Sequence, residues 1–281
     1  METENNKSIQ SLYKPRNPDS HKGDYGHALI VAGSKGKMGA ADIAAKACLR
    51  AGVGLATVNV PEEERGILQI AVPEAMLAMR ENTTDISHFS AACIGPGIGT
   101  DKGGQELLED LLDRFHQPLL LDADALNMVA ANNKLFDKIL AGTVLTPHPL
   151  EFDRLFGIHE TRESRISTAI AMAAKHKWVI VLKGHKTLVT HGSEVFVNNT
   201  GNAGLAKGGS GDALSGIICA FLAQGYKPFD AARIGVYIHG LAADIALNKQ
   251  SVESMLITDV IDCLGSAFKS LMGGSNNKYE I

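Results

Sequence analysis

Short apolar runs of strand length alternate with helical patterns along most of this 281-residue chain, and no other feature restricts its fold as strongly. Runs such as His27–Ala32 are apolar at consecutive positions, which indicates strands buried on both faces. Strands that alternate with helices favour a mostly parallel sheet with helices on both faces, a three-layer α/β/α fold. No repeat or low-complexity linker interrupts the pattern. We therefore expect residues 1–281 to form a single domain, with polar tails at about 1–8 and 273–281.

The boundaries of these elements follow from the apolar runs and from the helical spacing of apolar residues. We expect strands at His27–Ala32, Leu55–Val60, Ala92–Ile94, Leu119–Leu121, Val144–Thr146, Val179–Lys183, Thr187–Thr190 and Val195–Asn198. The turn at residues 191–193 predicts that the last two strands are antiparallel. We expect helices at Ala40–Ala51, Asp212–Gln224, Phe229–Asn248 and Ile257–Leu271.

The composition of the chain argues against nucleic-acid and membrane partners. The charged fraction is 21% and the net charge is −4, without a basic patch, so we expect no nucleic-acid partner. No apolar run approaches the ~20 residues that span a bilayer, so we expect no membrane association. The polar N-terminus does not resemble a secretory signal. The four cysteines lack CxxC spacing and lie in apolar stretches, which predicts buried thiols in a reducing, cytoplasmic setting.

The segment Thr200–Gly216 carries the strongest chemical signal, because its Lys-Gly-Gly-Ser-Gly-Asp core precedes a helix of small residues. Successive glycines allow backbone N–H groups to converge on one anion, and the helix dipole reinforces them. Gly209 and Gly211 would stabilise a transferring phosphoryl group, and Asp212 would accept a proton from the attacking hydroxyl. The alternative is a glycine-rich turn in which Asp212 only caps the helix.

Two common nucleotide motifs are absent. Gly33–Gly39 lacks the Gly-Lys-Ser/Thr ending of a P-loop, and Gly95–Gly99 is not GxGxxG. The chain is therefore neither a P-loop ATPase nor an ordinary dinucleotide dehydrogenase. Gly95–Gly99 either admits a ligand close to the backbone or is a plain tight turn.

Other polar loops follow expected strands, where ligands bind in open α/β sheets. His148 lies between two prolines that fix the backbone and aim it away from the strand, so we interpret it as a substrate contact. Asp122 and Asp124 either position a metal-bound water or cap a helix. Residues 183–187 either hold nucleotide phosphates or form an ordinary hairpin.

Together these motifs resemble the NAD(P)H-hydrate dehydratases, which have a ribokinase-like fold. The resemblance covers about residues 15 to 270. It rests on HKGDYGHALIVAGS (21–34), MGAADIAAKACLRAGVGLATV (38–58), GPGIG (95–99), DADAL (122–126), TPHPLEF (146–152) and NTGNAGLAKGGSGDALSG (199–216). The GGSGD motif is shared across ribokinase-like enzymes and indicates only the superfamily. The TPHPLEF and MGAADIAAKA motifs are more specific and point to the dehydratases.

The resemblance implies that ADP or ATP, with Mg²⁺, drives the conversion of the S epimer of hydrated NADH or NADPH back to the reduced cofactor. It implies that the substrate contacts are Ala41, Gly97, Gly99, His148 and Asp212. It implies that the nucleotide contacts are Lys183, Gly184, His185, Lys186, Thr187 and Gly211. It assigns no metal ligand to the chain, and it suggests a homo-oligomer, a tetramer, that works with a separate hydrate epimerase.

Two residues depart from the family pattern. Leu150 stands where glycine is expected, so we expect it to reshape the pocket near His148 without affecting the chemistry. Lys207 stands where threonine is usual and adds a charge beside the glycines. Two other functions remain open at this point. One is a kinase for a small alcohol such as a hydroxymethylpyrimidine, and the other is a non-catalytic regulator that binds an adenine nucleotide.

Overall fold

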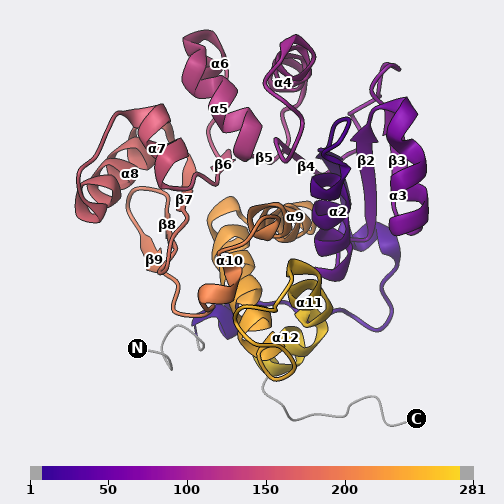
Figure 1. The fold of residues 1–281 in the computed structure, drawn as a ribbon, viewed down its shortest axis with the longest axis vertical. Coiled ribbons are helices and arrows are strands. Elements are labelled where there is room, and N and C mark those ends of the chain that lie inside the picture. Colours follow the sequence, from indigo (N-terminus) through magenta and orange to yellow (C-terminus); the bar gives the residue numbers. More distant parts are fainter. Residues whose placement is uncertain (1–7, 273–281) are drawn as a thin grey trace.

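The computed structural model describes residues 8–272, and its centre is a nine-stranded sheet with the order β3-β2-β1-β4-β5-β6-β7-β8-β9 (Figure 1). Neighbouring strands from β3 to β7 are parallel, and β8 and β9 extend the sheet as antiparallel strands. The strands are β1 (His27–Val31), β2 (Leu55–Val60), β3 (Met76–Met79), β4 (Ala91–Ile94), β5 (Leu119–Leu121), β6 (Val144–Leu145), β7 (Val179–Leu182), β8 (Leu188–Thr190) and β9 (Val195–Val197).

Helices cover both faces of the sheet, and consecutive strand residues pack into different cores. On β4, Cys93 belongs to the core under α2, α9 and α10, whereas Ala92 and Ile94 belong to the core under α4 and α5. The helices are α2 (Met38–Arg50), α3 (Arg65–Ala71), α4 (Lys102–Arg114), α5 (Ala123–Ala131), α6 (Asn133–Asp137), α7 (Pro149–Phe156), α8 (Arg162–His176), α9 (Ser210–Ala223), α10 (Pro228–Ala246), α11 (Ile257–Asp262) and α12 (Leu264–Leu271). The expected three-layer α/β/α fold is confirmed.

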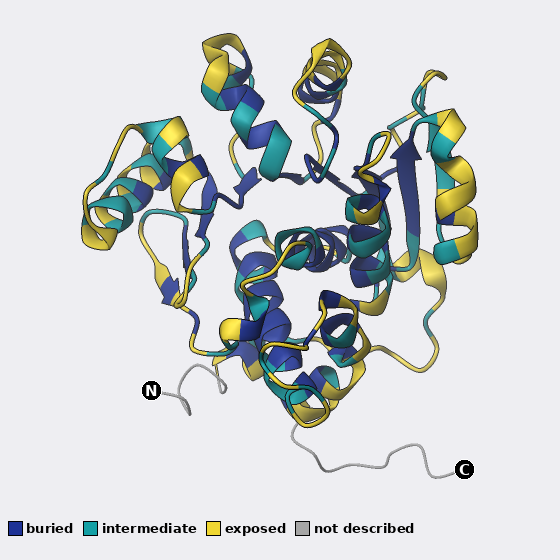
Figure 2. Ribbon diagram, viewed as in Figure 1, coloured by how far each residue is buried: buried dark blue, intermediate teal, exposed yellow. Residues whose placement is uncertain are grey.

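Helix α9 is the most enclosed helix of the fold, and every residue from Ala213 to Ala223 is buried (Figure 2). It lies against α2, where Gly216 permits backbone contact: a Cβ atom on Gly216 would come within 2.1 Å of the Ala44 carbonyl oxygen. Small residues on both helices thus hold α2 and α9 at a short separation. This contact fixes the position of the residues at the amino end of α9.

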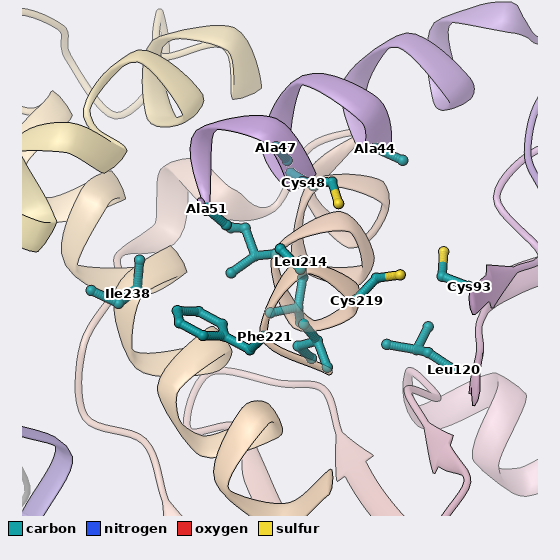
Figure 3. Packing of buried hydrophobic residues seen from close by; sticks show 14 of the residues in the cluster. Ala44, Ala47, Cys48, Ala51, Cys93, Leu120, Leu214, Cys219, Phe221 and Ile238 are labelled. Carbon is teal, nitrogen blue, oxygen red and sulfur yellow. The ribbon is translucent and has the colours of Figure 1, made fainter. Parts of the chain in front are cut away.

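Three thiols lie in the interior between α2, α9 and β4 (Figure 3). Cys48, Cys93 and Cys219 are buried, as expected, whereas Cys263 is only partly buried, and all four are free thiols. A hydrogen bond with Cys219, together with burial, raises the pKa of Cys93 well above its usual value. Cys93 is therefore protonated at neutral pH and acts as a small apolar side chain.

The structure departs from the expected elements in three places. β3 follows a stretch in which no strand was expected, and its residues are half-exposed or exposed at the edge of the sheet. The expected helix Ile257–Leu271 is two helices, α11 and α12, which meet at Cys263. Helix α5 was anticipated only as the helix that Asp122 and Asp124 could cap, and the other helices between α2 and α9 were not expected. The expected polar tails lie outside the described residues except at Ser8. No helix between residues 8 and 272 combines the length and apolar character needed to cross a bilayer.

Candidate active site

The carboxyl ends of β5, β6 and β7 converge on a buried carboxylate, Asp122, which directly follows β5 and is 1% exposed. Its Oδ1 accepts hydrogen bonds from the Lys183 ammonium and the Thr146 hydroxyl, both at 2.8 Å. Its Oδ2 accepts one from the Ser215 hydroxyl on α9, also at 2.8 Å. Asp122 therefore joins three strand ends to α9. The sequence left capping or metal binding open for Asp122, and its side chain forms no cap bond to α5.

Lys183 connects this network to α7. Its Nζ atom lies 2.8 Å from Asp122 Oδ1 and 3.7 Å from Glu151 Oε2, and its side chain is 19% exposed. Burial lowers the pKa of Lys183, but the Asp122 and Glu151 carboxylates outweigh burial and hold the pKa above its usual value. Lys183 is therefore a fixed cation beside the amino end of α9, where a Cβ on Gly211 would lie 3.4 Å from Nζ.

Asp212 lies in the first turn of α9 and is half-buried. Burial raises the pKa of Asp212 to about 6, the nearby Asp122 carboxylate adds to the rise, and Lys183 opposes it. A carboxylate with a pKa near neutrality accepts a proton more readily than an ordinary aspartate. The structure thus gives Asp212 the electrostatic environment of a general base.

The amino end of α9 has no side-chain cap. Gly209 occupies the N-cap position with a φ of +90°, a conformation that suits glycine. No side chain of residues 8–272 accepts a hydrogen bond from the first N–H groups. Helix α4 differs, because the Asp101 side chain accepts a hydrogen bond from Gly104 N. The first four N–H groups of a helix have no partner within it. At α9, Ser210 N donates to the Lys207 carbonyl oxygen at 3.4 Å, and the other early N–H groups are left to meet an anion from outside the described chain.

A cavity of about 710 Å³ adjoins this end of α9, and we call it the α9 cavity. Its wall includes five of the six residues implied as nucleotide contacts and one of those implied as substrate contacts. They are Lys183, Gly184, His185, Thr187, Gly211 and His148. Lys186, the sixth, is exposed and does not belong to this wall; its carbonyl oxygen accepts a hydrogen bond from Arg162.

The other implied substrate contacts lie outside the wall of the α9 cavity. Ala41 is fully buried on α2, facing the same way as Ala44 one turn later. Gly97 has a φ of +63°, and a Cβ there would meet the Ala40 methyl group at 3.0 Å. Gly99 donates its N–H to Asp124 Oδ2 at 2.9 Å. The loop 95–99 is therefore held against both α2 and the start of α5, and Asp124 serves to anchor it.

His148 has a local structural role as well as an exposed edge. Its Nδ1 accepts hydrogen bonds from Leu150 N at 3.1 Å and Glu151 N at 3.3 Å, so that His148 caps α7. Its side chain is nevertheless 43% exposed and belongs to the cavity wall. Leu150 is 64% exposed and does not line the α9 cavity.

The Lys207 ammonium donates hydrogen bonds to the carbonyl oxygens of Glu253 and Met255, the latter at 2.7 Å. Lys207 thus connects the glycine-rich loop to the segment before α11, a role that the sequence did not indicate.

Two other residues at this site, Ser215 and His239, were not predicted from the sequence. Ser215 binds Asp122 from one turn after Asp212, a helical spacing that was readable once the helix was expected. His239 on α10 lines the α9 cavity, is 6% exposed, and its Nε2 atom has no hydrogen-bond partner among the described residues. Burial lowers the pKa of His239 to about 4, so that its imidazole is neutral at physiological pH. No signal in the apolar α10 sequence distinguished it.

Comparison with known proteins agrees with this geometry. A family model described as NAD(P)H-hydrate dehydratase matches residues 28–265. The ADP-dependent (S)-NAD(P)H-hydrate dehydratase of Bacillus subtilis is 32% identical over 93% of this chain and 95% of its own length. A crystal structure of the B. subtilis ADP/ATP-dependent enzyme, grown with ATP and Mg²⁺, has a TM-score of 0.83 at 30% identity and covers 95% of this chain and 97% of that one.

Two further relatives bear on the fold of this chain and on its length relative to other family members. A ribokinase-like protein of Enterococcus faecalis has a TM-score of 0.85 at 30% identity, covering 95% of this chain and 94% of that one. The bifunctional NAD(P)H-hydrate repair enzyme of Escherichia coli is 40% identical over 89% of this chain and 49% of its own length. The chain thus spans about half the length of the bifunctional relatives that it matches. This chain has the ribokinase-like fold and belongs to the NAD(P)H-hydrate dehydratase family.

Proposed function

We propose that this protein uses ADP or ATP to dehydrate the S epimer of hydrated NADH or NADPH, releasing AMP or ADP, phosphate and the reduced cofactor. One observation carries the proposal: a half-buried carboxylate with a pKa near 6 stands at a helix amino end that has no side-chain cap and opens on a 710 Å³ cavity. The family supplies the substrate class. The site supplies a base, an anion site and room for a nucleotide.

In the proposed reaction, the C6 hydroxyl oxygen of the hydrate attacks the terminal phosphorus of the nucleotide, and the bond from that phosphorus to its bridging oxygen breaks. Asp212 accepts the hydroxyl proton. The N–H groups of Gly209 and Gly211 stabilise the charge of the transferring group, a kind of contribution for which one donor is worth about 2.7–4 kcal/mol of barrier. The C6–O bond then breaks as the ring nitrogen lone pair expels phosphate. Loss of a C5 proton restores the dihydropyridine ring.

Substrate and nucleotide approach Asp212 from different loops in this proposal. Lys183, Gly184, His185, Thr187 and Gly211 hold the nucleotide in the α9 cavity. Ala41, Gly97, Gly99 and His148 bound the hydrated ring. Lys183 neutralises phosphate charge from a position fixed by Asp122. Since Asp212 must be ionised to act as the base, kcat/KM is expected to fall below about pH 6.

A Mg²⁺ ion would enter with the nucleotide phosphates. The described residues contain no group of three or more His, Cys, Asp or Glu side chains suited to hold a metal. This arrangement fits Mg²⁺, which is commonly held by substrate phosphates, water and one or two carboxylates. Asp212 and Asp124 are the carboxylates positioned to assist, because both Asp122 oxygens already accept hydrogen bonds from the chain. When bound, the ion would neutralise charge on the phosphates.

The experiment is a recovery assay. Purified protein is incubated with hydrated NADH or NADPH and either ADP or ATP, and the return of dihydronicotinamide absorbance is followed together with free phosphate. We expect one phosphate released for each reduced cofactor recovered. A stable phosphorylated product without recovery would favour a small-alcohol kinase. Nucleotide binding without any turnover would favour a regulator.

The cellular setting follows from the same proposal. We propose a cytoplasmic homotetramer that acts beside a hydrate epimerase, which supplies the S epimer from the R epimer. The support is the family resemblance and the name of the bifunctional repair relatives. Light scattering of the purified protein tests the tetramer. An epimer-resolved assay tests the partnership, because recovery from a mixture of epimers should stop near the S fraction until epimerase is added.

A further inference from the structure

A second cavity, of about 620 Å³, lies at the same edge of the sheet as Asp122 but on the side of β2 and β3. Its wall combines the ends of β1 and β2, the loop after β3 and residues along the whole length of α4. We call it the Arg80 cavity and define it by Ser34, Asn59, Arg80, Asn82, Asp101 and Arg114. None of these residues has a role in the site described above.

The Arg80 cavity adjoins the loops proposed to bound the substrate. The hydroxyl of Ser34, a residue of the cavity wall, donates a hydrogen bond to the Gly97 carbonyl oxygen at 2.8 Å. Ile98, which lies between Gly97 and Gly99, also belongs to the wall. The sheet order reverses between β1 and β4, since β2 and β3 lie on one side of β1 and β4 begins the other side. Open α/β sheets bind ligands at such a switch point.

Arg80 is held in one orientation by the strand ends. Its Nε donates to Asn59 Oδ1 at 3.1 Å, and its Nη2 donates to the carbonyl oxygens of Ala32 at 2.7 Å and Asn59 at 3.1 Å. Its Nη1 has no hydrogen-bond partner among residues 8–272 and is not among their buried unpartnered atoms. The guanidinium thus presents one rigid, unused edge, the geometry that matches an oxyanion.

The carboxylates around Arg80 are already engaged elsewhere. Asp110 pairs with Arg114 at 2.7 Å, and Asp101 caps α4. Glu81 accepts the Glu62 N–H at 3.1 Å, and Glu106, the fourth carboxylate of the wall, pairs with Lys102 at 3.4 Å. No carboxylate of the described chain lies within ion-pair distance of the Arg80 guanidinium. Burial lowers the pKa of Arg80 to about 10, and the Glu81 and Asp101 carboxylates oppose this shift. A half-buried guanidinium without a carboxylate in ion-pair contact gains from an anionic ligand.

We propose that the Arg80 cavity binds the adenosine half of the dinucleotide substrate, with a phosphate of that half on the Arg80 guanidinium. This inference rests on the proposed function. The reduced ring reaches Asp212 by way of Gly97 and Gly99, and the rest of the substrate crosses loop 95–99 toward Ser34. The nucleotide that supplies the phosphoryl group occupies the α9 cavity, so that the two adenine moieties bind on opposite sides of the reacting hydroxyl.

The test compares two substrates that share the reacting ring. Hydrated NADH contains the adenosine half, and hydrated reduced nicotinamide mononucleotide does not. Arg80→Met should raise the KM for hydrated NADH about tenfold or more, the scale of a hydrogen bond to a charged group, and leave kcat within about twofold. The KM for the mononucleotide hydrate and the KM for ADP should not change. Arg50→Met, an exposed arginine remote from the cavity, is the matched control.

Because Arg80 also binds backbone carbonyls, a second variant leaves its contacts intact. Thr83→Glu places a new carboxylate in the cavity wall and should reproduce the selective rise in KM, whereas Ser87→Glu on the same loop, outside the wall, should not. An equal rise for both substrates, or no rise for hydrated NADH, would overturn the proposal.

A binding experiment separates this proposal from the proposed activity. Calorimetry with ADP-ribose, in the presence of saturating ADP, should show one site that Arg80→Met weakens about tenfold or more. If that site is present but no hydrate is dehydrated, the proposed function fails while the cavity still binds an adenosine diphosphate moiety. If ADP alone fills two sites, and Arg80→Met removes one, the cavity serves free nucleotide and the substrate assignment fails.

Discussion

Two carboxylates at the same edge of the sheet have opposite surroundings. Asp122, at the end of β5, accepts hydrogen bonds from Lys183, Thr146 and Ser215. Asp212, at the start of α9, receives no hydrogen bond to its carboxylate from residues 8–272, and burial raises its pKa to about 6. The difference fits two proposed roles: Asp122 is a fixed charge that holds Lys183 and α9 in place, and Asp212 is left free to exchange a proton.

The largest effect that the comparison predicts is on catalysis. Asp212→Asn removes the base without changing its shape, so kcat should fall about 10²- to 10⁴-fold. ADP affinity, measured by calorimetry, should stay within about threefold because the backbone N–H groups of α9 remain. Asp262→Asn, an exposed carboxylate, serves as the control. Near wild-type turnover in Asp212→Asn would assign the proton transfer to another group.

The next effect concerns stability at Asp122. Asp122→Asn leaves Lys183 buried without its nearest counter-charge, and breaking a buried ion pair costs about 3–5 kcal/mol. Urea unfolding should show that loss, moderated by Glu151 at 3.7 Å. The double variant Asp122→Asn, Lys183→Met should recover part of it. If the single variant unfolds at the wild-type urea concentration, Asp122 is not the fixed charge described above.

A smaller effect distinguishes the two carboxylates by pH. The folded pKa of Asp212 is about 6 and its unfolded value is 3.8, so the folded state binds more protons between these values. Its contribution to stability is therefore greatest below pH 4 and is lost as the pH rises through 6. Asp212→Asn should match the wild type near pH 4 and be more stable by up to about 3 kcal/mol at pH 8. Unfolding curves at both pH values test this, and equal stability at pH 8 would contradict the raised pKa.

The smallest effect is expected at Ser215. Ser215→Ala removes one donor from Asp122, while Thr146 and Lys183 keep theirs. A loss of about 1.5 kcal/mol in the free energy of unfolding is expected from a hydrogen bond to a charged group. Ser167→Ala on the exposed surface of α8 is a suitable reference and should change little. A cost at Ser215 as large as that at Asp122 would mean that the hydroxyl, rather than the ion pair, holds the network.

The sequence predicted the parts of this molecule that depend on local patterns. Consecutive apolar residues predicted most of the strands, and the turn at 191–193 predicted the antiparallel β8 and β9. The glycines before Asp212 predicted the helix amino end. β3 was missed because MLAM at an exposed edge has neither the β-branched residues nor the polar alternation of a strand.

The network around Asp122 was beyond such reasoning, because its members are brought together only by the sheet order. Ser215 is 93 positions from Asp122, and Lys183 is 61 positions away. The break at Cys263 is marked only by Gly265 two residues later, and one glycine inside a helical pattern does not by itself predict a break. The unused edge of Arg80 depends on two carbonyl oxygens from other strand ends, which no motif records.

The backbone contact between Gly216 and Ala44 has a consequence for redesign. Ala41 and Ala44 are one turn apart on α2, and Asp212 and Gly216 are one turn apart on α9. A single contact between the helices therefore sets the gap between Ala41, which the family resemblance assigns to the substrate, and Asp212, the proposed base. Adapting the enzyme to a bulkier alcohol by changing loops alone would leave that gap unaltered. Widening it requires a coordinated change of small residues along both helices, which a search through single substitutions would rarely find.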